Sequence, residues 1–211
     1  TEGTSALRPF DLKAIVLFER ARGRQREPAR VARPVAPHRL DLSDRRAAVA
    51  CLAAAFHDDP VFNWLTGYPS DPRPRLLHAY GAFIDSALRD AGHHTLVATA
   101  DGRVAGVAIW HGIDAWRTPV REVVRSTPAV VRAFGRRIPR ALGALSRIEK
   151  AHPAAPHWYL AYVGVDPAFQ GRGVGGLLVQ AGVDRADDEG VGAYLENSKP
   201  RNTPFYARHG F

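Results

Sequence analysis

Cysteine is nearly absent from this sequence of 211 residues, since it occurs once, as Cys51. A single cysteine excludes the internal disulfide framework on which many small secreted domains depend. Cys51 lies in a run of alanine, valine and leucine, which is typical of a buried thiol on a helix and not of a nucleophile. We therefore expect a reducing, cytoplasmic setting.

Long apolar runs are missing as well. We find no stretch of about eighteen apolar residues that would span a bilayer, and no hydrophobic signal sequence. The histidines lack the spacing of a zinc site, so we expect no metal. We expect the following histidines to be exposed or hydrogen-bonded instead: His93, His94, His111, His152, His157 and His209.

Positive charge is abundant, with a formal net charge of +8, but it is unevenly placed. Residues 1–34 hold eight Lys or Arg against four Asp or Glu, and residues 117–150 hold nine against two. Nucleic-acid binding is one interpretation, but both segments are poor in the aromatic residues that stack on bases. We favour solvated helix faces, which would also attract a polyanionic cofactor, and keep nucleic acid as the less favoured partner.

The hydrophobic content of 45% is enough for one domain with a real core. Residues 1–37 are interpreted as a basic N-terminal extension and linker, with a short amphipathic helix over residues 10–18 that includes Phe10, Ile15 and Phe18. Residues 38–211 form the domain.

Hydrophobic periodicity predicts the elements of this domain. Strands are expected over residues 39–42, 95–99, 104–110, 158–165 and 193–197. Helices are expected over 44–56, 75–91, 203–209 and from the glycine-rich turn to about 189, and also within 117–150, where Pro128 and Pro139 should interrupt them. Ser43 is the expected N-cap of the first helix, and Asp101-Gly102 predict a tight hairpin.

The most informative segment is Gln170-Gly171-Arg172-Gly173-Val174-Gly175-Gly176, which lies between an expected strand and an expected helix. The N–H groups of a helix start are unpaired, the helix dipole adds positive charge, and glycine lets a ligand approach the backbone. The segment therefore predicts a phosphate-binding turn.

Two patterns fit these glycines. Gly171-x-Gly173-x-x-Gly176 satisfies the dinucleotide-binding fingerprint, and Glu196 follows twenty residues later. The position argues against this interpretation, because only fifteen residues follow Glu196 and several strands precede the glycines. A doubly wound sheet needs more strand–helix units after its glycine turn.

The second pattern is Gln170-x-x-Gly173-x-Gly175, preceded by Val163-Gly164-Val165 and followed by Asn202-x-x-Phe205-Tyr206. It resembles the acetyl-CoA motif of the GNAT N-acetyltransferases. Within that family the chain looks most like puromycin N-acetyltransferase and its relatives. The likeness is dense over residues 157–211, thinner over 38–110 and absent over 1–37.

The resemblance implies an α/β fold of the GNAT type. Its sheet is mixed, mostly antiparallel and twisted, with a splay between the two central strands and helices on its flanks. The family sheet has two further strands after Gly210-Phe211, which the given sequence does not contain. We therefore expect either a C-terminally incomplete domain or a partner that covers the edge, such as a second copy in a homodimer.

The resemblance also implies where acetyl-CoA binds. The turn and Arg172 would hold the pyrophosphate, with Gln170 contacting the cosubstrate or capping the helix. Exposed main chain of the preceding strand would pair with pantetheine, and one of its N–H groups near Tyr162 to Gly164 would polarise the acetyl carbonyl. The implied cosubstrate-binding residues are Val163, Gly164, Val165, Gln170, Gly171, Arg172, Gly173, Val174, Gly175, Gly176, Asn202 and Tyr206.

Two residues are candidates for catalysis. Tyr206 would donate a proton to the leaving sulfur, since an ordinary phenol keeps its proton at neutral pH; the alternative is a core tyrosine. Glu196 would accept the amine proton through water, or would only orient the amine. Contacts from Asn63, His111 or Tyr162 are alternatives, and Asn202 would cap the last helix or hold pantetheine.

The implied acceptor is the primary amine of a small molecule, such as an aminoacyl-nucleoside antibiotic or a related metabolite. Alternatives are an amine of a protein or of aminoacyl-tRNA, and a CoA-binding module without turnover. Asp58 and Asp59 would attract a cationic amine or lie solvated in a turn. The aromatic residues that would form the acceptor wall or the core are Phe56, Phe62, Trp64, Tyr80, Trp110 and Trp116.

Overall fold

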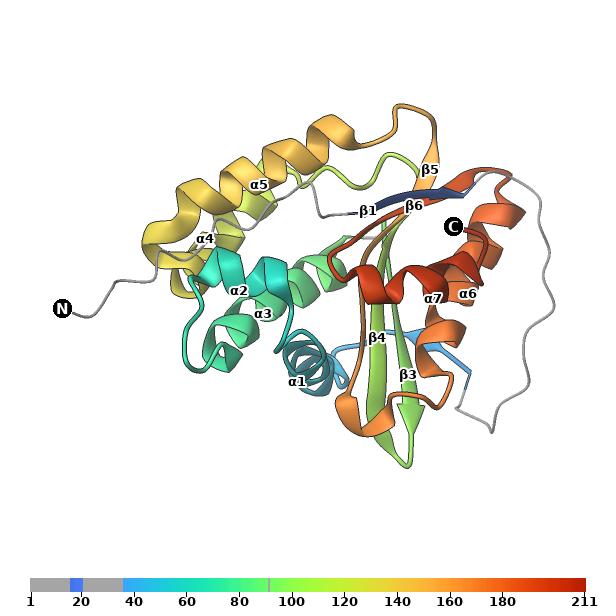
Figure 1. Cartoon of the computed structure of the whole chain (residues 1–211), viewed down its shortest axis with the longest axis horizontal. Helices are drawn as coiled ribbons and strands as arrows, with labels where there is room; N and C mark the ends of the chain where they lie inside the picture. Colours follow the sequence, from blue (N-terminus) through green and yellow to red (C-terminus); the bar gives the residue numbers. More distant parts are fainter. Residues whose placement is uncertain (1–15, 21–35, 91) are drawn as a thin grey trace.

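A single six-stranded sheet organises the protein (Figure 1), in the order β1-β6-β5-β4-β3-β2. This computed structural model describes residues 36–90 and 92–211 together with the backbone of 16–20. The strands are β1 Val16–Arg20, β2 His38–Arg39, β3 His93–Ala100, β4 Arg103–His111, β5 His157–Val165 and β6 Gly192–Asn197. Neighbours in the sheet are antiparallel except β5 and β6, which are parallel. The mixed, mostly antiparallel sheet predicted from the sequence is thus confirmed.

Helices cover both faces of this sheet. They are α1 Arg45–Ala55, α2 Pro60–Thr66, α3 Arg73–Arg89, α4 Val120–Phe134, α5 Ile138–Ala151, α6 Val174–Asp188 and α7 Thr203–Ala207. One buried cluster packs α1 to α5 against the sheet, and the other packs α6 and α7 against the opposite face. Among the described helices, none is long and apolar enough to cross a membrane.

The β3–β4 hairpin forms as its turn residues predict. Asp101 and Gly102 both have positive φ, 52° and 69°, which suits the two central positions of a tight hairpin turn. The strands that follow place Ala105 to Trp110 in the buried centre of the sheet.

A β-bulge divides β5 into two parts. Ile109 of β4 faces Tyr162, but Trp110 faces Leu160, so Ala161 is an extra residue in β5. Pairing between β5 and β6 runs from His157 to Leu160 and ends there. Because a bulge bends its strand, β5 leaves β6 at this point and the two strands diverge, which is the predicted splay.

Two local predictions about helix ends are wrong. Pro128 does not interrupt α4, which continues to Phe134; the break is at Gly135, where φ is 51°, and Pro139 lies in the first turn of α5. Ser43 does not cap α1, because the Asp41 carboxylate accepts the N–H groups of Ser43 and Asp44.

Residues 60–66 form helix α2, although no element was predicted there. Asp59 caps α2 by accepting the Phe62 N–H at 2.9 Å, and Pro60 follows at the position where a helix tolerates proline. These two signals are present in the sequence but the segment is only seven residues long.

The expected helix over residues 10–18 is also contradicted where the structure describes it. Val16–Arg20 form strand β1, which pairs antiparallel with β6 from Val16–Asn197 to Arg20–Ala193. Phe10 and Ile15 lie outside the described residues. Strand pairing satisfies the backbone groups along the edge of β6, the edge that we expected to be open or covered by a partner. The division at residue 37 stays a prediction.

Close packing of α6 on the sheet yields a stability prediction. A Cβ on Gly182 would lie 2.1 Å from Cε2 of Trp110, which is fully buried and donates its indole N–H to the Leu178 carbonyl at 3.3 Å. We expect Gly182→Ala to lower the free energy of unfolding by about 1–3 kcal/mol in urea denaturation, because helix and indole must move apart.

The matched control is Gly143→Ala in α5, where an added Cβ meets nothing within 4 Å. That helical substitution should instead raise stability by roughly 0.5–1 kcal/mol. Equal stability of the Gly182→Ala variant and the unmodified protein would contradict the packing argument.

Candidate active site

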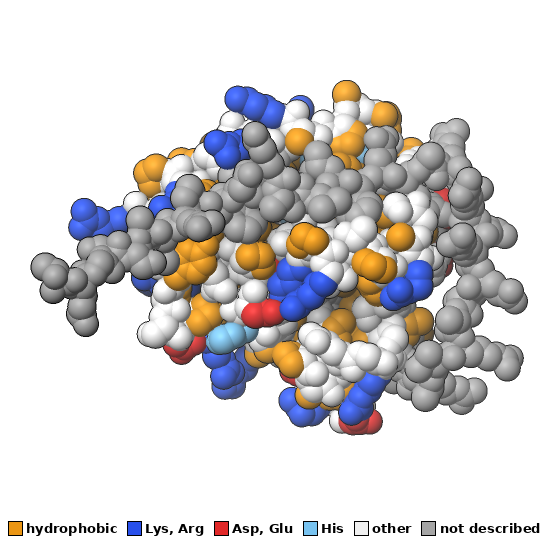
Figure 2. Space-filling model, viewed as in Figure 1, with side chains coloured by type: hydrophobic (Ala, Val, Ile, Leu, Met, Phe, Trp, Pro, Cys, Tyr) orange, Lys and Arg blue, Asp and Glu red, His pale blue; other side chains and the backbone are white. Residues whose placement is uncertain are grey.

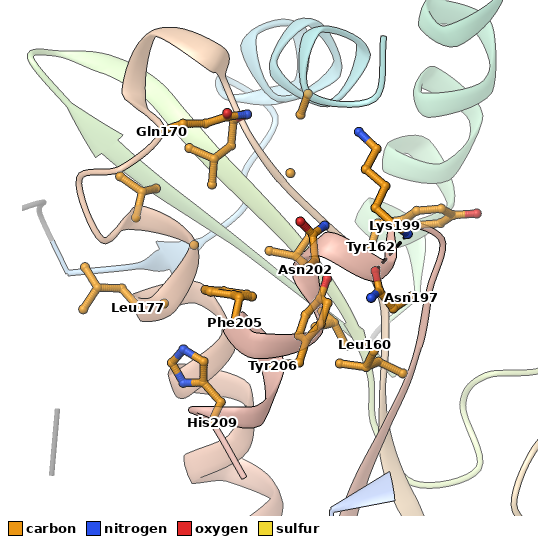
Figure 3. Close-up of a pocket in the computed structure, with 18 of the residues that line it drawn as sticks. Leu160, Tyr162, Gln170, Leu177, Asn197, Lys199, Asn202, Phe205, Tyr206 and His209 are labelled. Carbon is orange, nitrogen blue, oxygen red and sulfur yellow. Dashed lines mark hydrogen bonds between the residues drawn. The ribbon is translucent and has the colours of Figure 1, made fainter. Parts of the chain in front are cut away.

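A cleft of about 1100 Å³ opens where β5 and β6 diverge. The second half of β5, the start of α6 and the segment from β6 to α7 line it. Figure 3 shows Leu160 and Asn197 at the point of divergence, and Gln170, Leu177 and His209 farther along the cleft. The glycine turn, Tyr206 and Glu196, which the sequence singled out separately, all line this cleft.

The glycine turn presents unpaired N–H groups to the cleft. Gly173 has φ 80° and precedes α6, whose start has no side-chain cap. The N–H groups of Val174, Gly175 and Gly176 therefore have no partner within the helix. An added Cβ at Gly173 would meet no protein atom within 4 Å, so the turn is open to a ligand. Such a turn suits a phosphate group.

Side chains within the turn hold its shape. Gln170 donates its amide to the Val165 carbonyl at 3.1 Å, so it does not cap α6 as one alternative proposed. Asp166 accepts the Ala168 N–H at 2.9 Å. Gln170 thus closes the turn against the end of β5.

Arg172 lies beside the turn and is ion-paired. Its Nη1 is 3.2 Å from Asp101 Oδ2 at the tip of the β3–β4 hairpin, and its guanidinium lies 5.2 Å from the centre of the Phe169 ring. The contact to a pyrophosphate that the sequence suggested stays a prediction.

The backbone of β5 offers hydrogen-bonding groups toward the splay. The Asp166 N–H donates to the Ala105 carbonyl in β4. Because peptide groups alternate in direction along a strand, the N–H groups of Val165 and Val163 face away from β4, toward the cleft. These are the groups that the sequence predicted to pair with pantetheine.

Gly164 differs from its neighbours in this respect. By the same alternation its peptide N–H faces β4, and an added Cβ would lie 2.9 Å from both Ala55 and Leu52 of α1. Glycine is therefore needed here for the close approach of α1 to β5, and the implied contact of its N–H with the cosubstrate is not favoured by this orientation.

Tyr206 lies in α7 with its ring in the cleft, next to Asn202 (Figure 3). Its side chain is buried, and burial together with the Asp59 carboxylate raises the pKa of the phenol to about 12. It therefore remains a proton donor throughout the physiological range. Asn202 occupies the N-cap position of α7 without a side-chain cap bond, so the capping alternative is wrong.

Glu196 is almost fully buried, with a side chain 9% exposed. The Tyr159 hydroxyl donates to Glu196 Oε2 at 2.7 Å, and burial and this carboxylate raise the pKa of Tyr159 well above its ordinary value. The other oxygen, Oε1, lies 3.8 Å from Nδ1 of His152. The carboxylate is thus held at a fixed place in the cleft wall.

Two of the three alternative contacts are engaged elsewhere. Asn63 donates to the His57 carbonyl, and His111 Nδ1 lies 3.1 Å from the Ala115 carbonyl. Burial lowers the pKa of His111 to about 4, so it is neutral at pH 7. Tyr162 lines the cleft and stacks on Phe83 at 4.9 Å between ring centres.

Asp58 and Asp59 join the two sides of the cleft; Asp58 lies exposed in a turn, whereas Asp59 is buried. Lys199 Nζ lies 2.5 Å and Arg201 Nη2 2.8 Å from Asp58. Asp59 is 1% exposed and accepts the Ser198 hydroxyl at 2.5 Å. The sequence gave no signal for these contacts, because their partners are separated by about 140 positions.

The expected acceptor wall is only partly present. Phe56 lines the cleft, and Phe62 and Tyr80 pack with it in one aromatic cluster. For Trp110 the core alternative holds, because it is buried on the opposite face against α6. Cys51 is buried in α1 and burial raises its pKa to about 12, which confirms an inert thiol.

Comparisons with known proteins agree with this geometry. The model of the Acetyltransferase (GNAT) family matches residues 58–211. A protein of Schizosaccharomyces pombe named as an uncharacterized N-acetyltransferase is 28% identical over 188 residues, covering 84% of this chain and 74% of the relative.

Two solved structures are similar. One is described as histone acetyltransferase HPA2 and related acetyltransferase from Corynebacterium glutamicum; it has 27% identity and a TM-score of 0.63 over 84% of this chain and 83% of its own. A polyamine N-acetyltransferase of Drosophila melanogaster has 18% identity and a TM-score of 0.57, over 82% of this chain and 81% of its own.

The chain belongs to the GNAT acetyltransferase family, since the family model covers well over half of it. It is an acetyl-CoA-dependent N-acetyltransferase. The cleft fits this cosubstrate, because the open glycine turn suits the pyrophosphate and the free edge of β5 suits the pantetheine amides. Within the described residues, no group of three or more His, Cys, Asp or Glu is placed to hold a metal ion.

The glycine turn yields an affinity prediction. Gly173→Ala would place a methyl group in the space above the first turn of α6. This methyl group would disturb the charge-assisted hydrogen bonds from the N–H groups of the turn to the pyrophosphate, which are worth about 1.5–3 kcal/mol each. We expect the Kd for CoA, measured by isothermal titration calorimetry, to rise roughly 10- to 100-fold.

Gly135→Ala is the control for backbone strain, since Gly135 also has positive φ and open space but lies between α4 and α5. It should leave the Kd for CoA within about twofold of the unmodified value, a change well below 1 kcal/mol. Unchanged affinity of Gly173→Ala would show that the turn does not bind the pyrophosphate.

Proposed function

We propose that the protein acetylates the primary amine of a small molecule, by direct attack of the amine on acetyl-CoA in a ternary complex. The observation that carries this proposal is that Tyr206 and Glu196 line one cleft together with the glycine turn. A proton donor, a carboxylate and a phosphate-binding turn are the groups that this transfer needs.

Each group has a defined task. The N–H groups of Val163 and Val165 pair with pantetheine, and the Val163 N–H lies nearest the bulge, where it polarises the acetyl carbonyl. The amine nitrogen attacks that carbon, and the carbon–sulfur bond breaks as the tetrahedral intermediate collapses. Tyr206 protonates the leaving thiolate, and Glu196 receives the amine proton through water.

Tyr206→Phe tests the role of the phenol. We expect kcat to fall about 100-fold or more, because a positioned general acid contributes roughly 10²–10⁴. The KM for acetyl-CoA should stay within twofold, since the ring remains in place. An unchanged kcat would remove Tyr206 from the mechanism.

The pH dependence gives a second readout for the same residue. A phenol with a pKa of about 12 keeps its proton below that pH, so the unmodified enzyme should lose no kcat through Tyr206 between pH 7 and about 10. A steep loss near pH 9 that the Tyr206→Phe variant lacks would contradict this.

For the acceptor we propose an aminoacyl-nucleoside antibiotic or a related metabolite, which would make the protein a cytoplasmic resistance enzyme. The support is the likeness of residues 157–211 to puromycin N-acetyltransferase and its relatives. The Drosophila neighbour, by its name, forms N-acetylagmatine and so acts on a small amine. Lys and Arg side chains over α4 and α5 (Figure 2) would repel a strongly basic peptide.

An amine of a protein is the second candidate. The description of the Corynebacterium relative as a histone acetyltransferase favours it. Aminoacyl-tRNA would use the positive charge of residues 117–150 instead. Tyr206 in the cleft argues against a CoA-binding module without turnover.

An acceptor panel separates these candidates. The protein is incubated with acetyl-CoA and, in turn, puromycin, agmatine, a histone-tail peptide and aminoacyl-tRNA, and the release of free thiol is followed. We expect kcat/KM for puromycin to exceed that for the peptide and for tRNA by at least tenfold. Transfer to the peptide or tRNA alone would overturn the small-molecule proposal.

A further inference from the structure

A buried group of polar side chains continues from Glu196 away from the cleft. It consists of Glu196, Tyr159, His152 and His157, which come from β6, from β5 and from the residue that ends α5. The His152 side chain is 1% exposed, and the Trp116 ring stacks on it at 4.0 Å between ring centres. Neither imidazole is used by the mechanism described above.

Hydrogen bonds fix the protons on these rings. His157 Nδ1 lies 2.7 Å from the Ala155 carbonyl, which only accepts, so this nitrogen carries a hydrogen. In the neutral ring His157 Nε2 is then an acceptor. His152 Nε2 lies 2.9 Å from it and must be the donor. Neutral His152 therefore has no hydrogen on Nδ1.

That bare nitrogen faces Glu196. His152 Nδ1 and Glu196 Oε1 are 3.8 Å apart, and neither atom has a hydrogen-bond partner although both are buried. Two facing acceptors without a partner are unfavourable unless a proton lies between them. The Tyr159 hydroxyl occupies the other carboxylate oxygen and leaves Oε1 for this exchange. The arrangement has a place for one additional proton.

We propose that His152 and His157 take up, through Glu196, the proton that the acceptor amine releases on attack. The inference rests on the role proposed above for Glu196. Both histidines act through that carboxylate and not on the substrate directly, so they are positioning residues.

The transfer balances. The amine proton reaches Glu196 and passes from Oε1 to Nδ1 of His152, which must first approach from 3.8 Å to hydrogen-bond distance. At the same time the Nε2 hydrogen of His152 moves to Nε2 of His157. The Ala155 carbonyl then stabilises the His157 imidazolium through its Nδ1 hydrogen. After the product leaves, the proton returns by the same path to Glu196 and from there to water in the cleft, which restores the resting hydrogens of both rings, and Tyr206 regains its proton from water after CoA leaves.

The test compares Glu196→Gln, His152→Gln, His157→Gln and the double variant of Glu196 and His152. The titratable groups that face His152 are His157 and Tyr159 on β5, Tyr194 and Glu196 on β6, and His111 on β4. The control is His93→Gln, because His93 is buried to a similar degree as His157 but its ring lies against His111 instead of His152.

We expect each histidine variant to lower kcat about tenfold, less than the roughly 10²–10⁴ of a general base, with the KM for acetyl-CoA unchanged. The double variant should equal Glu196→Gln, because the histidine acts only through the carboxylate. The control should keep the kcat of the unmodified protein.

The low-pH limb of kcat gives the deciding readout. If the imidazoles accept the proton, that limb reports their protonation, and His152→Gln should move it to lower pH, toward an isolated carboxylate. If His152 were only a permanent cation beside Glu196, its removal would take away a positive charge that favours the ionised carboxylate and would move the limb to higher pH.

Three results would overturn the proposal while leaving Glu196 as the base. They are a shift of the low-pH limb to higher pH in His152→Gln, additive losses of kcat in the double variant, or an unchanged kcat in both histidine variants. Unchanged kcat in Glu196→Gln would instead overturn the proposed base and the proton transfer with it. If His152→Gln does not fold, as judged by circular dichroism, His157→Gln decides alone.

Discussion

The end of pairing between β5 and β6 after Leu160 is the constraint on which the site depends. Ala161 is one residue too many for the ladder with β4, so β5 bends and leaves its parallel neighbour. The backbone of Val163 and Val165 is thereby left without a strand partner on that side. The cleft and its free strand edge follow from this one extra residue, and the glycine turn lies at one end of that cleft.

The bulge also decides which side chains share a face. Tyr159 and Tyr162 lie on the face of α1 to α5, while Leu160 and Val163 pack on the face of α6. In β6 the alternation is regular: Leu195 and Asn197 face α6 and α7, and Tyr194 and Glu196 face the histidines. In the proposed mechanism, donor binding and proton removal therefore take place on opposite faces of one sheet.

The diverging strands are held by contacts between distant segments. The exposed ion pairs of Asp58 with Lys199 and Arg201 contribute little individually, because water screens them. The hydrogen bond from the Ser198 hydroxyl to the buried Asp59 carboxylate contributes more to stability, since Asp59 also caps α2. Gly164 brings α1 directly onto β5 beyond the bulge. Together these contacts fix the width of the cleft.

The sequence alone determined the family, the glycine turn and the helix that carries Tyr206, because these depend on residues close together in the chain. It also predicted the hairpin, most elements and the splay. It did not determine the strand of Val16–Arg20, the contacts of Asp58 and Asp59 with residues 198–201, or the proximity of His152 to Glu196. These depend on pairing and packing between segments far apart in sequence, whose side chains meet only when the sheet is complete.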